Sequence, residues 1–126
     1  MLKALIVEDE EDIKQLLLEV LEDKGYQVLV AGNGEIALQR IGEEMPDLIF
    51  ADVFMPVMDG LDLISRLKEN PDTSGIPVVI VTVMNARDTE KKAKELGVEH
   101  YLNKPWESAE LDLVLERVNK LNGRGR

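Results

Sequence analysis

The sequence contains no cysteine, and this absence excludes both a disulfide framework and a thiolate metal site. It contains a single histidine, His100, so a histidine-rich metal site is excluded as well. No apolar run approaches the ~20 residues that a membrane-spanning helix needs. The apolar start, Ala4-Leu5-Ile6-Val7, is too short for the core of a signal peptide. Together these absences predict a cytoplasmic protein with no contact to a membrane.

Basic residues are also scarce. Lys and Arg together number 15 against 25 Asp and Glu, which gives a formal net charge of −10. The average field of such a surface repels a polyanion, so we expect no direct contact with nucleic acid. The one basic cluster, Lys91, Lys92 and Lys94, is interpreted as the solvated face of a helix.

The length of 126 residues suits one domain. Short apolar runs alternate with longer segments whose apolar residues recur every three or four positions, which is typical of strands followed by amphipathic helices. The expected strands are residues 2–7, 28–31, 48–51, 78–83 and 98–102, and the expected helices lie around residues 13–21, 36–41, 61–67, 86–96 and 111–121. Five β–α units in strict alternation predict an α/β fold with a parallel sheet covered by helices on both faces.

This domain is expected to cover residues 1–121, with residues 122–126 as a tail or the start of a linker. Within it, Gly32-Asn33-Gly34-Glu35-Ile36-Ala37 matches the pattern of a dinucleotide-binding turn. The chain is too short for the two halves of such a fold, so the segment is interpreted as a tight turn in which Asn33 caps the next helix.

Several polar side chains fall where expected strands end. Glu8 and Asp9 follow the first strand, and Asp52 follows the third. Thr82 lies near the end of the fourth strand, and Lys104 follows the fifth. In an open parallel sheet, ligands bind beyond the carboxyl ends of the strands. These side chains are therefore expected to meet at one edge of the sheet.

Three carboxylates at one edge repel one another, at about 4 kcal/mol for each pair ~4 Å apart. One lysine cannot neutralise them, but a hard divalent cation with oxygen ligands can, and Mg²⁺ suits such a site. A magnesium ion beside Lys104 and Thr82 would suit a phosphoryl group, with Asp52 as its nucleophile. Alternatively, the acidic run at residues 8–12 stabilises the N-terminus of the following helix and has no other role.

Two segments are the most specific: Pro46-Asp47-Leu48-Ile49-Phe50-Ala51-Asp52, and Met55-Pro56-Val57-Met58-Asp59-Gly60. With Leu5-Ile6-Val7-Glu8-Asp9-Glu10, Thr82 and Asn103-Lys104-Pro105-Trp106, they resemble the receiver domain of two-component response regulators. The resemblance covers essentially the whole chain. Among receivers, the chain resembles single-domain regulators of the chemotaxis type. It implies a three-layer, flavodoxin-like (βα)5 sandwich with strand order 2-1-3-4-5.

The resemblance also implies a role for each matching residue. Asp52 is the phosphoacceptor, Lys104 contacts the phosphoryl group, and Thr82 and Tyr101 form the switch. The implied ligands of Mg²⁺ are Glu8, Asp9, Asp52 and the backbone carbonyl of Phe54. The Lys104–Pro105 bond is implied to be cis.

The implied partners are a histidine kinase or phosphotransfer protein upstream and a downstream protein or effector domain, with a homodimer as a further expectation. The face formed by the fourth helix, the fifth strand and the last helix would change on phosphorylation. Slow self-phosphorylation and autodephosphorylation are implied, but not a dedicated enzyme.

Three residues depart from the common receiver pattern: Phe54, Val83 and Met84. They predict slow labelling by small phosphodonors and a long-lived phosphoryl state. An aspartate-nucleophile phosphatase is disfavoured, because such enzymes use an acid where this chain has Phe54, which cannot transfer a proton. A pseudo-receiver, which binds partners without phosphoryl turnover, stays open as an alternative.

Overall fold

The computed structural model describes residues 2–83 and 87–121, so the predicted tail at residues 122–126 lies outside them. Strands and helices alternate along the described chain, as the sequence predicts. Their bounds are β1 (Lys3–Val7), α1 (Glu11–Asp23), β2 (Gln27–Ala31), α2 (Gly34–Glu43), β3 (Leu48–Asp52), α3 (Gly60–Glu69), β4 (Val78–Val83), α4 (Arg87–Glu95), β5 (His100–Lys104) and α5 (Ser108–Leu121).

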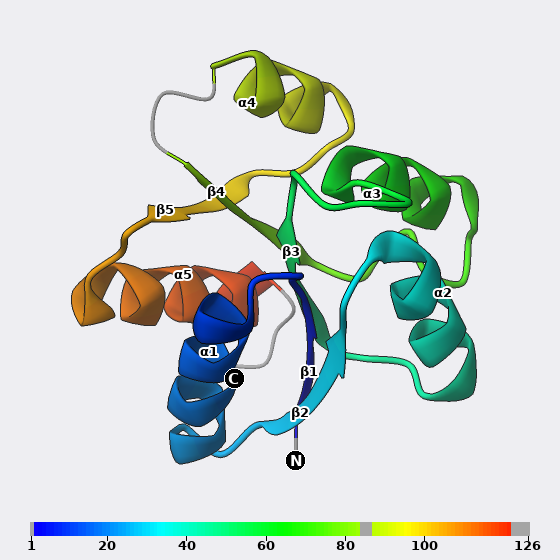
Figure 1. Cartoon of the computed structure of the whole chain (residues 1–126). Helices are drawn as coiled ribbons and strands as arrows, with labels where there is room; N and C mark the ends of the chain where they lie inside the picture. The colour runs from blue at the N-terminus through cyan, green and yellow to red at the C-terminus, as the bar shows by residue number, and fades with distance from the viewer. Residues whose placement is uncertain (1, 84–86, 122–126) are drawn as a thin grey trace.

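The strands form one parallel sheet in the order β2-β1-β3-β4-β5. Helices α1 and α5 cover one face of this sheet, and α2 and α3 cover the other (Figure 1). The side chain of Ala93 places α4 on the same face as α2 and α3. The predicted α/β sandwich and its strand order are therefore confirmed.

The core lies on both faces of the sheet, because successive side chains of a strand point to opposite sides. In β3, Leu48 and Phe50 pack beneath α1 and α5, whereas Ile49 and Ala51 pack beneath α2 and α3. All four side chains are buried. Burial of a large apolar side chain stabilises the fold by about 1.5–3 kcal/mol. The uninterrupted apolar runs in the sequence are thus a consequence of a sheet that is covered on both sides.

Helices α1 and α4 end in the same way, with a glycine in the left-handed region. Gly25 has φ 93° and Gly97 has φ 87°. In α1 the N–H of Tyr26 donates to Leu21 O at 3.0 Å, and in α4 the N–H of Val98 donates to Ala93 O at 2.9 Å. These bonds satisfy carbonyl groups that a helix end leaves free. The C-terminal role predicted for Gly25 is confirmed.

The expected bounds of the fifth strand, residues 98–102, are wrong by two residues. Val98 is buried but precedes the strand, because its N–H caps the C-terminus of α4 by donating to Ala93 O. The strand instead begins at His100 and runs to Lys104, which pairs in register with Val83 of β4. This shift places Lys104 within the sheet.

Helix α2 begins as predicted at the turn that mimics a dinucleotide-binding pattern. The side chain of Asn33 accepts a hydrogen bond from the N–H of Ile36 at 2.9 Å, so Asn33 is the N-cap. The next residue, Gly34, donates its N–H to Met58 O at 3.2 Å. The turn therefore ties α2 to the loop that follows β3.

The described helices include none that combines the length and the apolar character needed to cross a membrane.

Candidate functional site

The predicted site residues come from four neighbouring strands, β1, β3, β4 and β5. Glu8 follows β1, Asp52 ends β3 and Lys104 ends β5. Asp52 pairs in register with Val81, one residue before Thr82. The carboxyl edge of the sheet therefore brings a carboxylate pair, a hydroxyl and an ammonium group to one place, as the strand pattern predicts.

Lys104 joins the acidic side chains of the site. Its Nζ lies 3.0 Å from Glu8 Oε1, 3.5 Å from Asp52 Oδ2 and 3.5 Å from Glu10 Oε1. Burial disfavours the ammonium, but the hydrogen bond to Glu8 and the charges of Asp52, Glu8 and Glu10 outweigh it. The pKa of Lys104 is consequently raised. Lys104 therefore stays protonated, with its ammonium group surrounded by carboxylates.

Glu8 is the most deeply buried acid of the group, at 1% exposure. Burial raises its pKa from 4.5 to about 7, and Asp52 adds to this rise through a hydrogen bond and through its charge. The hydrogen bond from Lys104 and the backbone N–H of Glu10 act in the opposite direction. The fold therefore places a carboxyl group where its negative charge is costly unless a further cation joins it.

Within the described residues, one carboxylate oxygen from each of Glu8, Glu10 and Asp52 lies within 4.8 Å of the other two. An all-oxygen donor set with excess negative charge fits a hard divalent cation such as Mg²⁺. Asp9, a predicted ligand, is exposed and is not a member of this group. Phe54 has a side chain that is 63% exposed, and the ligand role of its carbonyl stays a prediction.

Glu10 is the residue of this cluster that sequence reasoning did not select. It lies in the same acidic run as Glu8, and its ion pair with Lys104 brings it to the site. Its side chain is 61% exposed, so no burial pattern in the sequence distinguishes it from the acids of the following turn.

Thr82 and Asn103 bring buried polar atoms to the same edge. The two residues are register partners on β4 and β5. Thr82 is fully buried, and among the described residues neither its Oγ1 nor Asn103 Oδ1 has a hydrogen-bond partner. An unsatisfied buried polar group costs about 1–3 kcal/mol, and most such groups in proteins have a partner. Within the described part of the chain, the Thr82 hydroxyl therefore has unused hydrogen-bonding capacity.

Gly60 holds the loop that follows Asp52 close to the end of β3. Gly60 donates its N–H to Val53 O at 2.9 Å, and a Cβ at Gly60 would lie 2.3 Å from Asp52 O. Between them, Met58 N–H donates to Pro56 O at 2.8 Å around Val57, which has φ 70°. This is a γ-turn, a rare and strained conformation for a β-branched residue.

The peptide bond after Lys104 is cis, as the family resemblance implies. Trp106, two residues later, is half-buried and packs beneath α1 and α5. Val83 and Met84 are predicted to slow phosphoryl transfer. The side chain of Val83 and the whole of Met84 lie outside the part of the chain that the structure describes.

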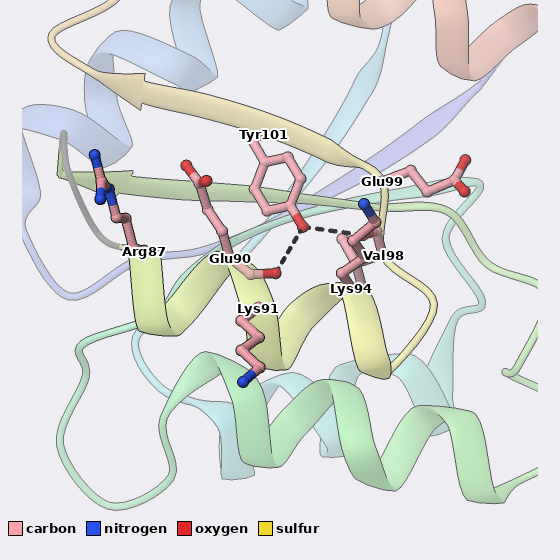
Figure 2. Close-up of a pocket in the computed structure, with 7 residues that line it drawn as sticks. All are labelled: Arg87, Glu90, Lys91, Lys94, Val98, Glu99 and Tyr101. Carbon is pink, nitrogen blue, oxygen red and sulfur yellow. Dashed lines mark hydrogen bonds between the residues drawn. The ribbon is translucent and has the colours of Figure 1, made fainter.

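Tyr101, the predicted switch residue, lies between β5 and α4 (Figure 2). Its hydroxyl is within hydrogen-bond distance of two backbone carbonyls, Glu90 O at 3.2 Å and Val98 O at 3.1 Å. Its ring packs against the apolar core beneath α2, α3 and α4. Burial, together with the charges of Glu90 and Glu99, raises the pKa of Tyr101, so the hydroxyl stays protonated and can donate.

Comparison with known proteins agrees with this arrangement. Residues 4–116 match the family model described as the response regulator receiver domain. The chain is 38% identical over 118 residues to sporulation initiation phosphotransferase F of Bacillus subtilis, covering 94% of this chain and 91% of that protein. It is 35% identical to the phosphate regulon transcriptional regulatory protein PhoB of Pseudomonas aeruginosa, covering 96% of this chain but only 53% of that protein.

Solved structures give the same result. The chemotaxis protein CheY4 of Vibrio cholerae superposes with a TM-score of 0.87 at 30% identity, covering 94% of this chain and 98% of that one. The signal receiver domain of a histidine kinase from Syntrophus aciditrophicus superposes with a TM-score of 0.87 at 33% identity, covering 95% and 91% of the two chains.

Proposed function

This chain belongs to the response regulator receiver domain family of two-component systems, and from that premise we propose that it is a phosphoacceptor signalling module with Asp52 as the acceptor. The observation that carries the proposal is the meeting of Asp52, Lys104 and the Thr82 hydroxyl at one edge of the sheet, where that hydroxyl has no hydrogen-bond partner among the described residues. Receiver domains are signalling domains rather than dedicated enzymes, and we propose the same for this chain.

In the proposed reaction, a carboxylate oxygen of Asp52 attacks the phosphorus of a phosphohistidine. An oxygen–phosphorus bond forms as the nitrogen–phosphorus bond to the imidazole breaks, and the partner's histidine leaves. Asp52 is only 5% exposed, so the donor must reach into the site. Because a histidine supplies the phosphoryl group, the upstream partner is a histidine kinase or a phosphotransfer protein.

The chain's own residues would stabilise the transferred group. Lys104 can move its ammonium from the carboxylates to a phosphoryl oxygen, since it already lies 3.5 Å from Asp52 Oδ2. Thr82 can donate the hydrogen bond that it lacks within the described residues. Bound Mg²⁺ would supply charge neutralisation for the phosphoryl oxygens.

For the magnesium site we propose Glu8, Asp9 and Asp52, with the Phe54 carbonyl. Glu10, unlike Asp9, is a member of the carboxylate cluster, but its ion pair with Lys104 accounts for that position. The buried Glu8, with its pKa raised to about 7, gains most from a second cation.

The proposed switch follows from the contacts of Thr82 and Tyr101. A hydrogen bond from Thr82 to the phosphoryl group would favour one arrangement of β4 and α4, and Tyr101 contacts α4 through the carbonyl of Glu90. A downstream protein or effector domain, or a second copy of the chain, would then recognise α4, β5 and α5.

Incubation with acetyl phosphate and Mg²⁺, followed by intact-protein mass spectrometry, tests this function. We expect one phosphoryl adduct, which should not form in Asp52→Asn or when EDTA is present during the incubation. Asp62→Asn, which removes an exposed acid from α3, is the matched control and should keep the adduct. Absence of an adduct with acetyl phosphate and with a panel of phosphorylated histidine kinases would favour the pseudo-receiver alternative.

A further inference from the structure

Two buried polar atoms on neighbouring strands lack a hydrogen-bond partner among the described residues: the hydroxyl of Thr82 on β4 and the side-chain carbonyl of Asn103 on β5. A third such atom, Glu8 Oε1, lies 3.0 Å from the Lys104 ammonium, and this ion pair accounts for it. Most buried side-chain polar atoms in proteins have a hydrogen-bond partner. Thr82 and Asn103 are therefore the two residues of the site whose polar atoms need an explanation.

The sheet places these two side chains next to each other. Thr82 and Asn103 are register partners on adjacent strands, and such strands lie about 4.8 Å apart. In β4, Ile80 packs beneath α2 and α3, and in β5 the ring of Tyr101 packs on the same face of the sheet. Because side chains alternate along a strand, Thr82 and Asn103, each two residues further on, point to that face as well.

The two groups are chemically complementary. A threonine hydroxyl can donate one hydrogen bond, whereas the carbonyl oxygen of an asparagine side chain can only accept. In the structure the two atoms are not bonded to each other. The last torsion of an asparagine side chain is broad, so a rotation of Asn103 can turn its oxygen toward the Thr82 hydroxyl. Such a bond would satisfy both buried atoms at once.

Thr82 also lies between Asn103 and the proposed phosphoacceptor. Strand β4 stands between β3, which ends in Asp52, and β5, which carries Asn103. A phosphoryl group on Asp52 would offer the Thr82 hydroxyl a second acceptor. A hydrogen bond to a charged phosphoryl oxygen is stronger than one to a neutral carboxamide. The single proton of the hydroxyl would therefore pass from the weaker acceptor to the stronger one.

We propose that Asn103 is a positioning residue for phosphoryl transfer: its side-chain carbonyl holds the Thr82 hydroxyl while Asp52 is unmodified, and releases it to a phosphoryl group on Asp52. The inference rests on the proposed function, since the release requires Asp52 to be the acceptor. Asn103 acts only through Thr82. Molecules whose hydroxyl is held by Asn103 lack one donor for the phosphoryl group, so Asn103 weakens the binding of that group.

Beryllium trifluoride is the probe for this role, because it binds a carboxylate oxygen in the tetrahedral shape of a phosphoryl group. Its affinity for the intact protein in Mg²⁺ is measured by fluorine NMR. Asn103→Leu removes the acceptor with little change in shape, and we expect it to bind the probe roughly three- to tenfold more tightly than the unaltered protein. Asn103→Ala should change the affinity in the same direction, and it replaces the leucine variant if that variant does not fold.

A Thr82→Val background separates a positioning role from a structural one. Valine keeps the shape of threonine but has no hydroxyl. In this background, adding Asn103→Leu should change the affinity for the probe by less than about twofold. The matched control is Asn119→Leu, which removes a half-buried carboxamide from α5. It should bind the probe within about twofold of the unaltered protein.

Urea unfolding without Mg²⁺ and without the probe tests the bond itself. In a double-mutant cycle of Thr82→Val and Asn103→Leu, we expect the folding constants to show a favourable coupling of about two- to tenfold. A coupling factor near one would overturn the proposal. This measurement does not depend on Asp52. If the unaltered protein binds no beryllium trifluoride and takes up no phosphoryl group, the phosphoacceptor function is refuted, and the coupling factor alone decides whether Asn103 holds Thr82.

The probe can overturn the proposal in three further ways. Weaker binding in Asn103→Leu would mean that the carboxamide contacts the phosphoryl group directly. Equal tightening with and without the Thr82 hydroxyl would mean that Asn103 does not act through Thr82. An affinity that Asn103→Leu leaves unchanged would mean that Asn103 does not compete for the hydroxyl.

Discussion

Glu8 has a carboxyl group that is 1% exposed, lies 3.0 Å from the Lys104 ammonium and has a pKa of about 7. Burial is the main cause of this raised pKa, followed in the same direction by Asp52. Because the folded pKa exceeds the usual 4.5, folding favours the protonated form. The stability that this preference contributes is fully present below about pH 4.5 and is lost as the pH rises through about 7.

Glu8→Gln should therefore change the pH dependence of stability. In EDTA, the variant should gain stability relative to the unaltered protein as the pH rises from about 5 to 8, by on the order of 2–3 kcal/mol. Urea unfolding at each pH measures this difference. A difference that stays constant with pH would contradict the assigned cause. Asp62→Asn, at an exposed position, should show no comparable trend.

Gly60 shows how tightly the backbone is packed beside Asp52. A Cβ at this position would lie 2.3 Å from Asp52 O and 3.0 Å from Val53 Cα, and both are backbone atoms. Gly60→Ala should therefore lower the free energy of unfolding by about 2 kcal/mol or more, as overpacked sites do. It should also slow labelling of Asp52, because the acceptor strand must shift.

Gly42→Ala is the matched control for this substitution. Gly42 lies in α2, and a Cβ there meets nothing within 4 Å. Alanine at this position should raise the free energy of unfolding by about 0.5–1 kcal/mol, because glycine has the higher conformational entropy when unfolded. Equal effects in the two variants would indicate that the close approach of Gly60 to Asp52 is not real.

At the residue scale, the sequence predicts Asp52, Thr82 and Lys104 because each lies where an apolar strand ends. It does not predict that Glu10 joins the cluster, since an exposed side chain is placed by its ion pair and not by a burial pattern. It also gives no measure of the pKa of Glu8, which depends on burial and on residues distant in the chain.

At the scale of helices and strands, the start of α2 contacts the loop that follows β3 and Asp52. Asn33 caps α2, and Gly34 is so close to Met58 that a Cβ would lie 2.8 Å from Met58 Cγ. The start of the helix thus supports the loop that carries Asp59 and Gly60.

Asn33→Ala should cost about 1 kcal/mol of stability, since it leaves the Ile36 N–H without its 2.9 Å bond. Asn33→Asp keeps an acceptor at the same place and should restore most of the loss. Thermal unfolding followed by circular dichroism measures both variants. If the aspartate variant is as unstable as the alanine variant, the loss is not due to capping.

Element types and order were readable from the sequence because buried parallel strands are continuous apolar runs between amphipathic helices. Strand β4 was predicted with its observed bounds, Val78–Val83, from its β-branched residues. Strand β5 was displaced because Val98 is as apolar as a strand residue, and only the hydrogen bond to Ala93 assigns it to the end of α4. The hydropathy pattern of the sequence does not reveal a hydrogen bond of this kind.

At the scale of the whole molecule, the net charge of −10 favours expansion of the chain through self-repulsion. Mg²⁺ should raise the free energy of unfolding more than NaCl does at matched ionic strength, because the proposed site would bind it in addition to the general screening of charge. At ten times its dissociation constant, a ligand of the folded state adds about 1.4 kcal/mol. Urea unfolding in the two salts measures the excess.

Variants identify the residues behind this excess. Asp9→Asn should remove most of it, whereas Glu10→Gln should retain most of it. The opposite order would replace Asp9 with Glu10 in the proposed ligand set. An equal effect of the two salts on the unaltered protein would indicate that no specific magnesium site exists.

The parallel sheet also gives the molecule two ends that differ in how well they tolerate insertions. Every side chain for which we propose a role in phosphoryl chemistry lies at the carboxyl edge, whereas the turns at Gly25, at residues 44–47 and at Gly97 lie at the amino edge. A loop can lengthen at those turns without moving an acidic residue of the site. The amino edge is therefore where a lineage can add insertions, or an engineer a fused reporter, while the chemistry at the opposite edge stays the same.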